Sequence, residues 1–200
     1  CIRDRLYIDR TRTKIRELAY SLEADGFATP DMTLIAEHIT TGNVKELSYT
    51  RSPDSLVWAL LDTGQLRCLT YEREQDVVAW HRHVIGGTDA LIKSIAAIPS
   101  ADELQEQLYM VVSRTINGAT KQYVEFLEEA FDQAKGDTPA DAFFVDSGLS
   151  YSGSGVNSLS GLSHLEGETV KVLVNGANHP DKVVSSGAIS LDLSLIHISE

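Results

Sequence analysis

The clearest alternation of apolar and polar segments in the chain lies between Ser55 and His83. Three apolar runs in this stretch, Leu56–Leu61, Leu66–Tyr71 and Val77–Trp80, are separated by two short polar segments. Runs of this length that contain β-branched and aromatic residues and are bounded by turn-forming residues are typical of β-strands. The pattern therefore predicts an antiparallel meander of three strands.

The first of these strands is apolar on both faces. Side chains alternate between the two faces of a strand, and every position of Leu56–Leu61 is apolar. A strand of this kind is buried between layers. Such a strand fits the core of a sandwich or a blade of a β-propeller that is packed between neighbouring blades. We therefore expect a mainly β protein built from antiparallel meanders, and the pattern leaves both the sandwich and the propeller open.

One short amphipathic helix is predicted over Asp31–Ile39. Thr29 can cap its N-terminus, and Pro30 suits the first helical position because its missing N–H would have no partner there. The apolar positions have the i, i+3, i+4, i+7 spacing of a single helical face: Met32, Ile35, Ala36 and Ile39.

An Asn-Gly pair in the middle of the chain predicts another hairpin. Asn117-Gly118 separates Val111–Ile116 from Ala119–Leu127, and these two residue types are favoured where a tight hairpin turn needs left-handed backbone. Together with the apolar run that precedes it, this hairpin predicts a second three-stranded meander over about residues 90–128. A shorter hairpin is predicted over residues 6–20.

Composition predicts how the chain is divided. Residues 1–145 are expected to form one domain of β-meanders, truncated at its N-terminus, and the Ser- and Gly-rich residues 146–165 to form a linker. Residues 166–192 are expected to begin a small β-barrel or sandwich module, with a hairpin at Asn175-Gly176. Residues 193–200 resemble the translation of a sequencing adapter and are interpreted as not native. On this interpretation we expect the chain to be an internal fragment of a longer reading frame, of metagenomic origin.

Charge and cysteine content argue against several classes of protein. The formal net charge of −12 argues against a surface that binds duplex DNA, but it suits a channel wall past which DNA moves without binding. Two cysteines, Cys1 and Cys68, do not make a disulfide framework. Cys68 lies within an apolar run and is interpreted as a small core residue. No apolar stretch is long enough to span a membrane, so no membrane partner is expected.

The segment Trp80-His81-Arg82-His83 is the first candidate for chemistry. On a strand, His81 and His83 project to one face, as two metal ligands would. No third ligand follows at a zinc-type spacing, and no Cys-x-x-Cys pair is present. The preferred interpretation therefore places both imidazoles at the rim of the core, with Trp80 buried.

Other candidate motifs also lack their required context. Gly153-Ser-Gly155 resembles the start of a phosphate-binding loop, but Ser158 stands where a dinucleotide-binding loop needs its third glycine, and no Walker lysine follows. No Gly-x-Ser-x-Gly motif is present, so His164 has no serine nucleophile to pair with. Four acidic residues could supply a glycosidase pair but are interpreted as solvated surface: Glu128, Glu129, Asp141 and Asp146. Three basic residues form no stripe interleaved with aromatic residues: Arg82, Arg114 and Lys121. The sequence thus predicts no catalytic, cofactor-binding or metal-binding residue, no cofactor and no enzymatic activity.

Several longer segments carry a family resemblance: Arg16–Gly26, Leu34–Ile39, Trp80–His83, Arg114–Thr120 and His164–Thr169. Together they resemble long β-rich proteins of phage and prophage structural gene clusters, similar to the tail tubular or nozzle proteins of short-tailed phages. The resemblance covers most of residues 5–191 and only part of the length of such proteins.

The C-terminal part of the chain carries a second resemblance. His164–Leu191 is similar to the β module labelled as the first catalytic-cysteine half-domain (FCCH) of ubiquitin-activating enzymes. Ubiquitin chemistry is not implied, because the nucleotide motif of the adenylation domain is missing and Cys68 lies in the other predicted module.

The resemblance to tail proteins implies that residues 1–145 form an incomplete β-propeller-like domain. It also implies a non-enzymatic structural role in the virion tail, after synthesis in the cytoplasm of a bacterial host. The implied partners are copies of the same chain in a ring and other tail proteins. DNA would pass through the ring without specific binding. The alternative hypothesis is an adhesin with a propeller or sandwich fold that binds host-surface glycan through the loops Val84–Asp89 and Ser147–Ser163, because loops on a rigid β scaffold commonly carry recognition.

Overall fold

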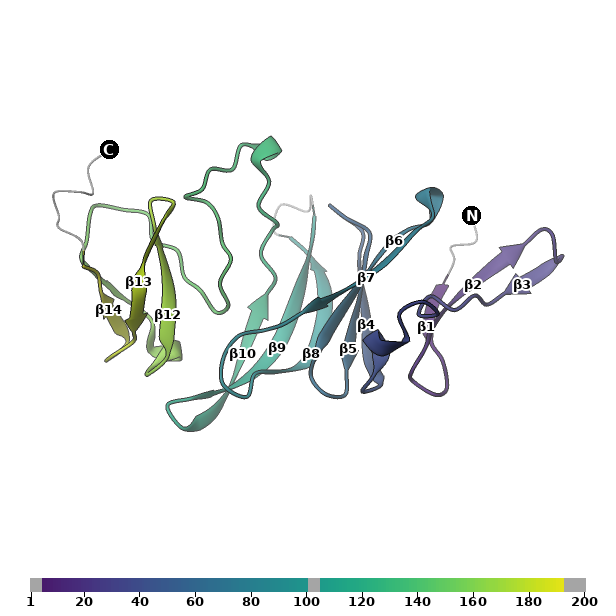
Figure 1. The fold of residues 1–200 in the computed structure, drawn as a ribbon, viewed down its shortest axis with the longest axis horizontal. Coiled ribbons are helices and arrows are strands. Elements are labelled where there is room, and N and C mark those ends of the chain that lie inside the picture. Colours follow the sequence, from purple (N-terminus) through teal and green to yellow (C-terminus); the bar gives the residue numbers. More distant parts are fainter. Residues whose placement is uncertain (1–4, 101–104, 193–200) are drawn as a thin grey trace. The chain divides into compact units, whose positions relative to one another are not determined.

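The computed structural model describes residues 5–100 and 105–192 (Figure 1). Cys1 and the adapter-like residues 193–200 lie outside the described residues. Within the described ranges the protein is mainly β, its strands pair antiparallel and no α-helix occurs, which confirms the predicted fold class at that level. No closed barrel or propeller is detected in these ranges.

The chain divides into two compact units. The first comprises the described parts of Cys1–Ile85, Leu91–Val112 and Tyr123–Leu127. The second comprises the described parts of Gly86–Ala90, Ser113–Gln122 and Glu128–Glu200. The hairpin of the second predicted meander contributes its tip to the second unit and the rest of its two strands to the first.

A four-stranded meander forms the centre of the first unit. Its strands follow one another in chain order: β4 (Val44–Thr50), β5 (Leu56–Leu61), β6 (Leu66–Glu72) and β7 (Val77–His83). The last three strands are those predicted from the apolar runs, so that prediction is confirmed. Gly64, with φ of 78°, turns the chain between β5 and β6, and a Cβ there would lie 2.9 Å from the Cβ of Leu91. Glycine is therefore required both by the backbone conformation and by the close approach of the next sheet.

The second sheet is the second predicted meander. It consists of β8 (Leu91–Pro99), β9 (Glu106–Ile116) and β10 (Ala119–Phe126), with β9 in the middle. Asn117 and Gly118 have φ of 49° and 73°, so both residues adopt the left-handed conformation that a tight hairpin turn requires. The hairpin predicted from the Asn-Gly pair is therefore confirmed.

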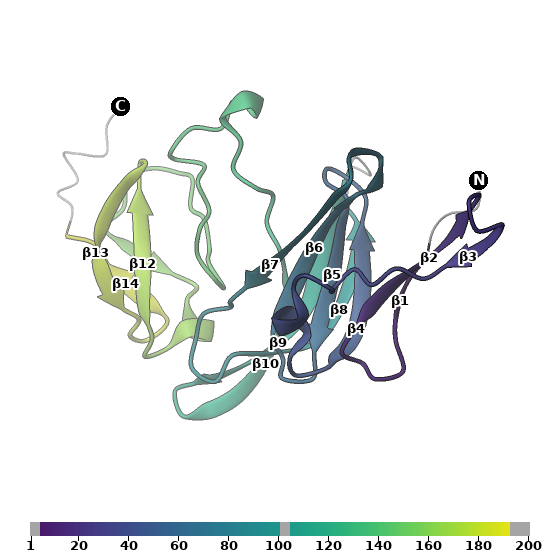
Figure 2. The ribbon, with the colours of Figure 1, turned by 45° about the vertical axis from the view of Figure 1, so that its right-hand side comes forward.

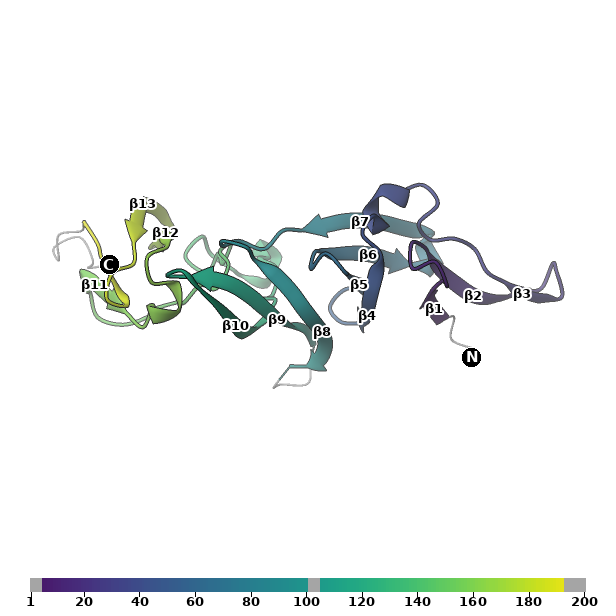
Figure 3. The ribbon, with the colours of Figure 1, turned by 90° about the horizontal axis from the view of Figure 1, so that it is seen from below.

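The two sheets of the first unit pack face to face around one core, and Figure 3 shows them as separate layers. The buried residues of this core come from β5, β6, β8 and β9: Trp58, Leu60, Leu66, Cys68, Ile92, Ile95, Leu108, Met110 and Val112. The alternate side chains Ala59 and Leu61 of β5 point to the opposite face and pack with Ile15 and Val44. The prediction that this strand is buried on both faces is confirmed.

Polar side chains link the edges of the two layers. The Glu46 carboxylate on β4 accepts hydrogen bonds from the Ser94 hydroxyl at 2.9 Å and from the Ile95 backbone N–H at 3.0 Å on β8. The Ser48 hydroxyl accepts the Ala97 backbone N–H at 2.8 Å. Burial raises the pKa of Glu46, but these donors and the neighbouring Lys45 outweigh it, so the pKa lies below its usual value. These hydrogen bonds connect β4, an edge strand of the first sheet, to β8, an edge strand of the second.

A hairpin at the N-terminal end covers the outer face of the four-stranded sheet. It is formed by β1 (Arg5–Ile8) and β2 (Ile15–Ser21), as predicted, and a third strand, β3 (Gly26–Ala28), extends it. Ile15 of β2 belongs to the core on that face. In Figures 1 and 2 the end formed by β2 and β3 projects away from the two layers of the first unit.

The α-helix predicted over Asp31–Ile39 is wrong. The only helical turn there is the 3₁₀ helix η1 (Glu37–Thr40). Ile35, which was expected on the buried face, is 86% exposed, whereas Ile39 is buried. The predicted cap at Thr29 is also absent, because the described structure has no α-helix for it to cap.

Competing hydrogen bonds explain why no α-helix forms. The Asp31 carboxylate accepts hydrogen bonds from the backbone N–H and the hydroxyl of Thr33, at 2.9 and 2.6 Å, which forms a local turn. The backbone N–H of Met32 donates to the carbonyl of Ile15, and the carbonyl of Met32 accepts the indole N–H of Trp80 at 2.8 Å. The backbone groups that a helix would use are therefore engaged with distant strands.

The second unit contains two short strand pairs around a small core. β11 (Ser158–Ser160) pairs with β14 (Ala188–Ser190), and β12 (Thr169–Val174) pairs with β13 (Ala177–Val183) through the predicted Asn-Gly turn. β11 lies inside the segment predicted as a linker. The buried residues of the core are Leu162, Val184, Ile189 and Leu191. The remaining 3₁₀ turns are η2 (Arg73–Gln75) in the first unit, and η3 (Gln133–Lys135) and η4 (Ser163–Leu165) in the second.

Candidate functional site

The pairing of β6 with β7 brings a cysteine and two histidines together. Cys68 lies directly opposite His81, and Leu66 lies opposite His83. Because side chains two residues apart share a face of a strand, His81 and His83 project to the same side as Cys68. The antiparallel register therefore places the Cys68 thiol directly opposite His81 and diagonally across from His83.

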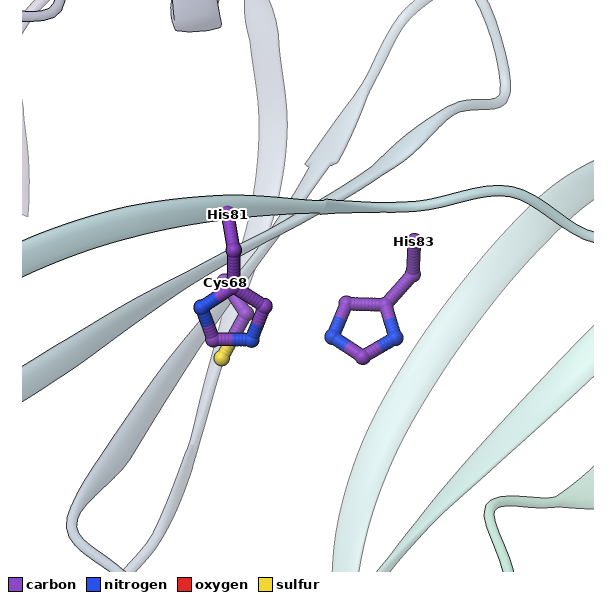
Figure 4. Close-up of side chains that lie close together, drawn as sticks. All are labelled: Cys68, His81 and His83. Carbon is purple, nitrogen blue, oxygen red and sulfur yellow. The ribbon is translucent and has the colours of Figure 1, made fainter.

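Donor atoms of these three side chains all lie within 4.8 Å of one another. Figure 4 shows the Cys68 sulfur beneath the His81 ring and the His83 ring beside it. The centroids of the two imidazole rings are 4.9 Å apart. Over residues 5–100 and 105–192, this is the one group of three or more histidine, cysteine or carboxylate side chains that could hold a metal ion.

The cluster runs from the core of the first unit to its surface. Cys68 is fully buried and belongs to the core between the two sheets. His83 is half-buried, and its ring centroid lies 5.0 Å from that of Trp58. Trp58 is itself fixed by a hydrogen bond of 3.0 Å from its indole N–H to the Thr50 hydroxyl. His81 is exposed, so the group is open to solvent on one side.

Burial determines the protonation of the three groups. It raises the pKa of the Cys68 thiol to about 12, so the thiol is protonated at neutral pH. It lowers the pKa of His81, and it lowers the pKa of His83 together with the nearby charge of His81. Both shifts favour the neutral form of the imidazoles. The Nε2 atom of His83 is buried and has no hydrogen-bond partner within the described part of the chain.

Inspection of spacing along the sequence found two of these three residues. The shared face of His81 and His83 followed from strand alternation, but Cys68 was interpreted only as a core residue. Its burial is confirmed, yet it also lies beside both histidines. The available signal was the predicted turn between β6 and β7. Glu72 pairs with Val77 next to this turn, so the residues four positions further along each strand, Cys68 on β6 and His81 on β7, are also paired.

Three other residues singled out in the sequence are held by hydrogen bonds of their own. The Asp141 carboxylate accepts hydrogen bonds from the backbone N–H and the hydroxyl of Thr138, at 2.9 and 2.7 Å. Asp146 accepts the backbone N–H of Gly86 at 2.9 Å. Arg114 is buried, and its Nε–H donates to the Gly86 carbonyl at 2.8 Å.

The remaining candidates are exposed, lie in a loop or contact a loop. Arg82, Lys121, Glu128 and Glu129 are exposed. Gly153 and Gly155 lie in a loop without regular secondary structure. The ring nitrogen Nε2 of His164 lies 2.9 Å from the Ser147 carbonyl. None of these residues joins the group of Cys68, His81 and His83.

Comparison with known proteins adds no family assignment: no protein-family model matches the chain, and no curated protein matches it significantly. Among the helices of residues 5–100 and 105–192, none has the length and apolar character needed to cross a membrane.

Proposed function

We propose that this protein is a non-enzymatic structural subunit that acts by associating with copies of itself, in the tail of a phage or prophage particle. The observation that supports self-association is an exposed apolar face on the hairpin of β2 and β3. The setting in a tail is supported by the family resemblance of the sequence segments.

The apolar face lies on the part of the hairpin that projects from the first unit. Leu18 and Tyr20 occupy alternate positions of β2 and are exposed, whereas Ile15 and Ala19 on the opposite face are buried. Leu22, in the turn that follows β2, is also exposed. Phe27 of β3, which is 63% exposed, lies opposite Tyr20, and the two rings meet edge to face with centroids 5.8 Å apart.

Two physical properties make this hairpin suited to association. Contiguous exposed apolar side chains mark surfaces that bind other proteins. β3 is also an edge strand of its sheet, so one side of its backbone can pair with a further strand. We take the partner to be a second copy of the chain, because the tail proteins that the sequence resembles assemble as rings.

The ring proposal extends to the remaining features of the chain. The four-stranded meander β4–β7 has the strand count and order of one propeller blade, which supports a propeller-like body. Other tail proteins would contact the ring, and the acidic surface would repel DNA that passes through it. The small core around Ile189 would belong to the FCCH-like module.

The proposal is tested by measuring the oligomeric state of the protein and of two matched variants. Phe27→Glu places a charge on the hairpin face, and Ile35→Glu places the same charge on an exposed apolar residue elsewhere in the first unit. Sedimentation analysis should show oligomers for the parent protein and for Ile35→Glu, and a shift to monomers for Phe27→Glu. A parent protein that is monomeric at every concentration, or an equal effect of both variants, contradicts the proposal.

A glycan-binding adhesin is the second candidate. Its supporting observation is that Tyr151, in the candidate loop Ser147–Ser163, is 54% exposed, with its hydroxyl donating to the Ser154 carbonyl at 3.0 Å. An exposed, locally fixed aromatic ring can pack against the apolar face of a sugar. Glycan-array binding by the protein that is lost in Tyr151→Ala would favour this function. Absence of binding, together with oligomers, would favour the structural one.

A further inference from the structure

We propose that Cys68, His81 and His83 form a binding site for a thiophilic transition-metal ion, with Zn²⁺ as the ion that the donor set fits best. The site is independent of the oligomeric role proposed above. It rests on the juxtaposition of one thiol and two imidazoles across the β6–β7 pair, at an edge of the sheet that is open to solvent.

The separation of the donor atoms is close to what a shared ion requires. In a tetrahedral zinc site with Zn–N and Zn–S bonds of about 2.0–2.3 Å, neighbouring donors lie about 3.3–3.7 Å apart. The three donors here lie within 4.8 Å of one another. Rotation of the His81 side chain can close the remaining distance, because this side chain is exposed on an edge strand of the sheet.

The kinds of donor select the class of ion. Thiolate and imidazole are ligands for zinc and copper, whereas Mg²⁺ and Ca²⁺ prefer carboxylate, carbonyl and water oxygens. Three protein ligands leave one position of a tetrahedral ion free. His81 lies on the solvent side of the group, so water can occupy that fourth position.

The buried imidazole supplies an independent observation. The Nε2 atom of His83 is buried without a hydrogen-bond partner in residues 5–100 and 105–192. Buried polar atoms are almost always partnered in native proteins, so an atom of this kind calls for a ligand. A metal ion bound at Nε2 provides one.

The protonation balance of the binding step is simple. Burial lowers the pKa of both imidazoles, which favours the neutral form that a metal ligand needs, and raises the pKa of the Cys68 thiol, which favours the protonated thiol in the metal-free protein. When Zn²⁺ forms its bond to the sulfur, the S–H bond breaks and the proton passes to solvent. One proton is therefore released for each ion bound, with no change in oxidation state.

The direct test is a titration of the full chain in which Cys1 is replaced by serine, so that Cys68 is the only thiol. Co²⁺ is used as a spectroscopic substitute for Zn²⁺, because a cobalt–thiolate bond produces intense near-ultraviolet absorption. We expect this absorption to saturate at one equivalent of Co²⁺ and to be abolished by one equivalent of Zn²⁺. Mg²⁺ should produce no change.

Variants of the three ligands identify the site. Loss of an outer hydrogen-bond partner of a metal ligand commonly costs 10–100-fold in affinity, so removal of a direct ligand should weaken Zn²⁺ binding by at least about 100-fold. We expect this loss for Cys68→Ser, His81→Gln and His83→Gln. His38→Gln, which changes an exposed histidine outside the site, should bind Zn²⁺ as the parent does.

The decisive variant is His81→Gln, because His81 is exposed and its replacement leaves the core intact even if Cys68→Ser unfolds the protein. Zn²⁺ should raise the melting temperature of the parent and of His38→Gln, but not that of His81→Gln. Absence of thiolate–cobalt absorption, or undiminished Zn²⁺ binding by His81→Gln, overturns the proposal.

Discussion

The two units of this protein differ in how their strands are buried. In the first unit, β5 has side chains packed on both faces, with Leu60 in one core and Leu61 in the other. In the second unit, β12 alternates between exposed and partly buried positions along its whole length. β5 therefore belongs to a layer that is covered on both faces, whereas β12 is one strand of a two-stranded pair.

The difference shows that how deeply the side chains of a strand are buried depends on what packs against its sheet, and not on how many strands the unit contains. Two-stranded pairs are marginally stable unless they pack on another element. The second unit therefore depends on a small shared core and on local turns, whereas the first distributes its stability over two cores on either side of one sheet. Four predictions break or sharpen this contrast, from the largest expected effect to the smallest.

Truncation of one leucine in each unit should destabilise the protein by very different amounts. Leu60→Ala removes a fully buried side chain and should lower the free energy of unfolding by about 2–5 kcal/mol through lost burial and a residual cavity. Leu173→Ala on β12 alters a residue that is 42% exposed and should cost less than about 0.5 kcal/mol. Urea unfolding of both variants measures the contrast. Equal losses would show that burial in the two units is not different.

Removal of the link between the layers should weaken the first unit. Glu46→Ala leaves the Ile95 N–H and the Ser94 hydroxyl without their acceptor and should cost about 1–3 kcal/mol. Glu46→Gln keeps a carbonyl acceptor and should cost less. Thermal unfolding, with amide exchange at Ile95 as the local readout, checks both variants. An unchanged exchange rate in Glu46→Ala would argue against the link.

The two Asn-Gly turns provide a matched pair. Gly118→Ala and Gly176→Ala both place a Cβ on left-handed backbone, which costs about 1–2 kcal/mol. A Cβ at Gly118 meets no atom within 4 Å, but a Cβ at Gly176 would lie 3.1 Å from the Cβ of Pro139. We therefore expect Gly176→Ala to be the more destabilising of the two in urea unfolding. The reverse order would contradict the crowding argument.

The smallest expected effect depends on pH. Burial raises the pKa of Asp31, but the ion pair of 2.7 Å with Lys14 and the hydrogen bonds from Thr33 outweigh it, so the pKa lies below its ordinary value. A lowered folded-state pKa stabilises the protein above the unfolded value of about 3.9, and that stabilisation is lost as the pH falls through the folded-state pKa.

Asp31→Asn should accordingly destabilise the protein at pH 7 by up to about 1 kcal/mol, the range for a partly exposed pair. The difference between parent and variant should shrink below about pH 4, as Asp31 of the parent becomes protonated. Unfolding curves at several pH values give this difference directly. A difference that is constant down to pH 2 would show that the charge of Asp31 has no stabilising role.

Local patterns in the sequence were sufficient for most of the strands. The apolar runs that became β5, β6 and β7 could be read directly, because strand formation there requires only alternation and bounding turns. The two Asn-Gly pairs located their hairpins, because few other residue pairs adopt left-handed backbone at both positions. The short pairing of β11 with β14 could not be read, because its strands contain three residues each and lie far apart in the chain.

The candidate site was predictable only in part. Strand alternation placed His81 and His83 on one face, but the proximity of Cys68 depends on the register of β6 against β7. That register was accessible from the turn that joins the two strands. How deeply each of the three groups is buried was not, because burial depends on the second sheet packed over β6.

The sequence by itself determined the antiparallel β character, the principal strands, the tight turns and the acidic charge. These properties follow from side-chain alternation, backbone preference and composition, all of which act over a few residues. Only the tertiary structure decided that residues 31–39 form no α-helix and that Cys68 lies with His81 and His83. Both outcomes depend on contacts between distant residues, such as the Trp80 hydrogen bond to Met32, and local preference yields where such contacts use the same backbone groups.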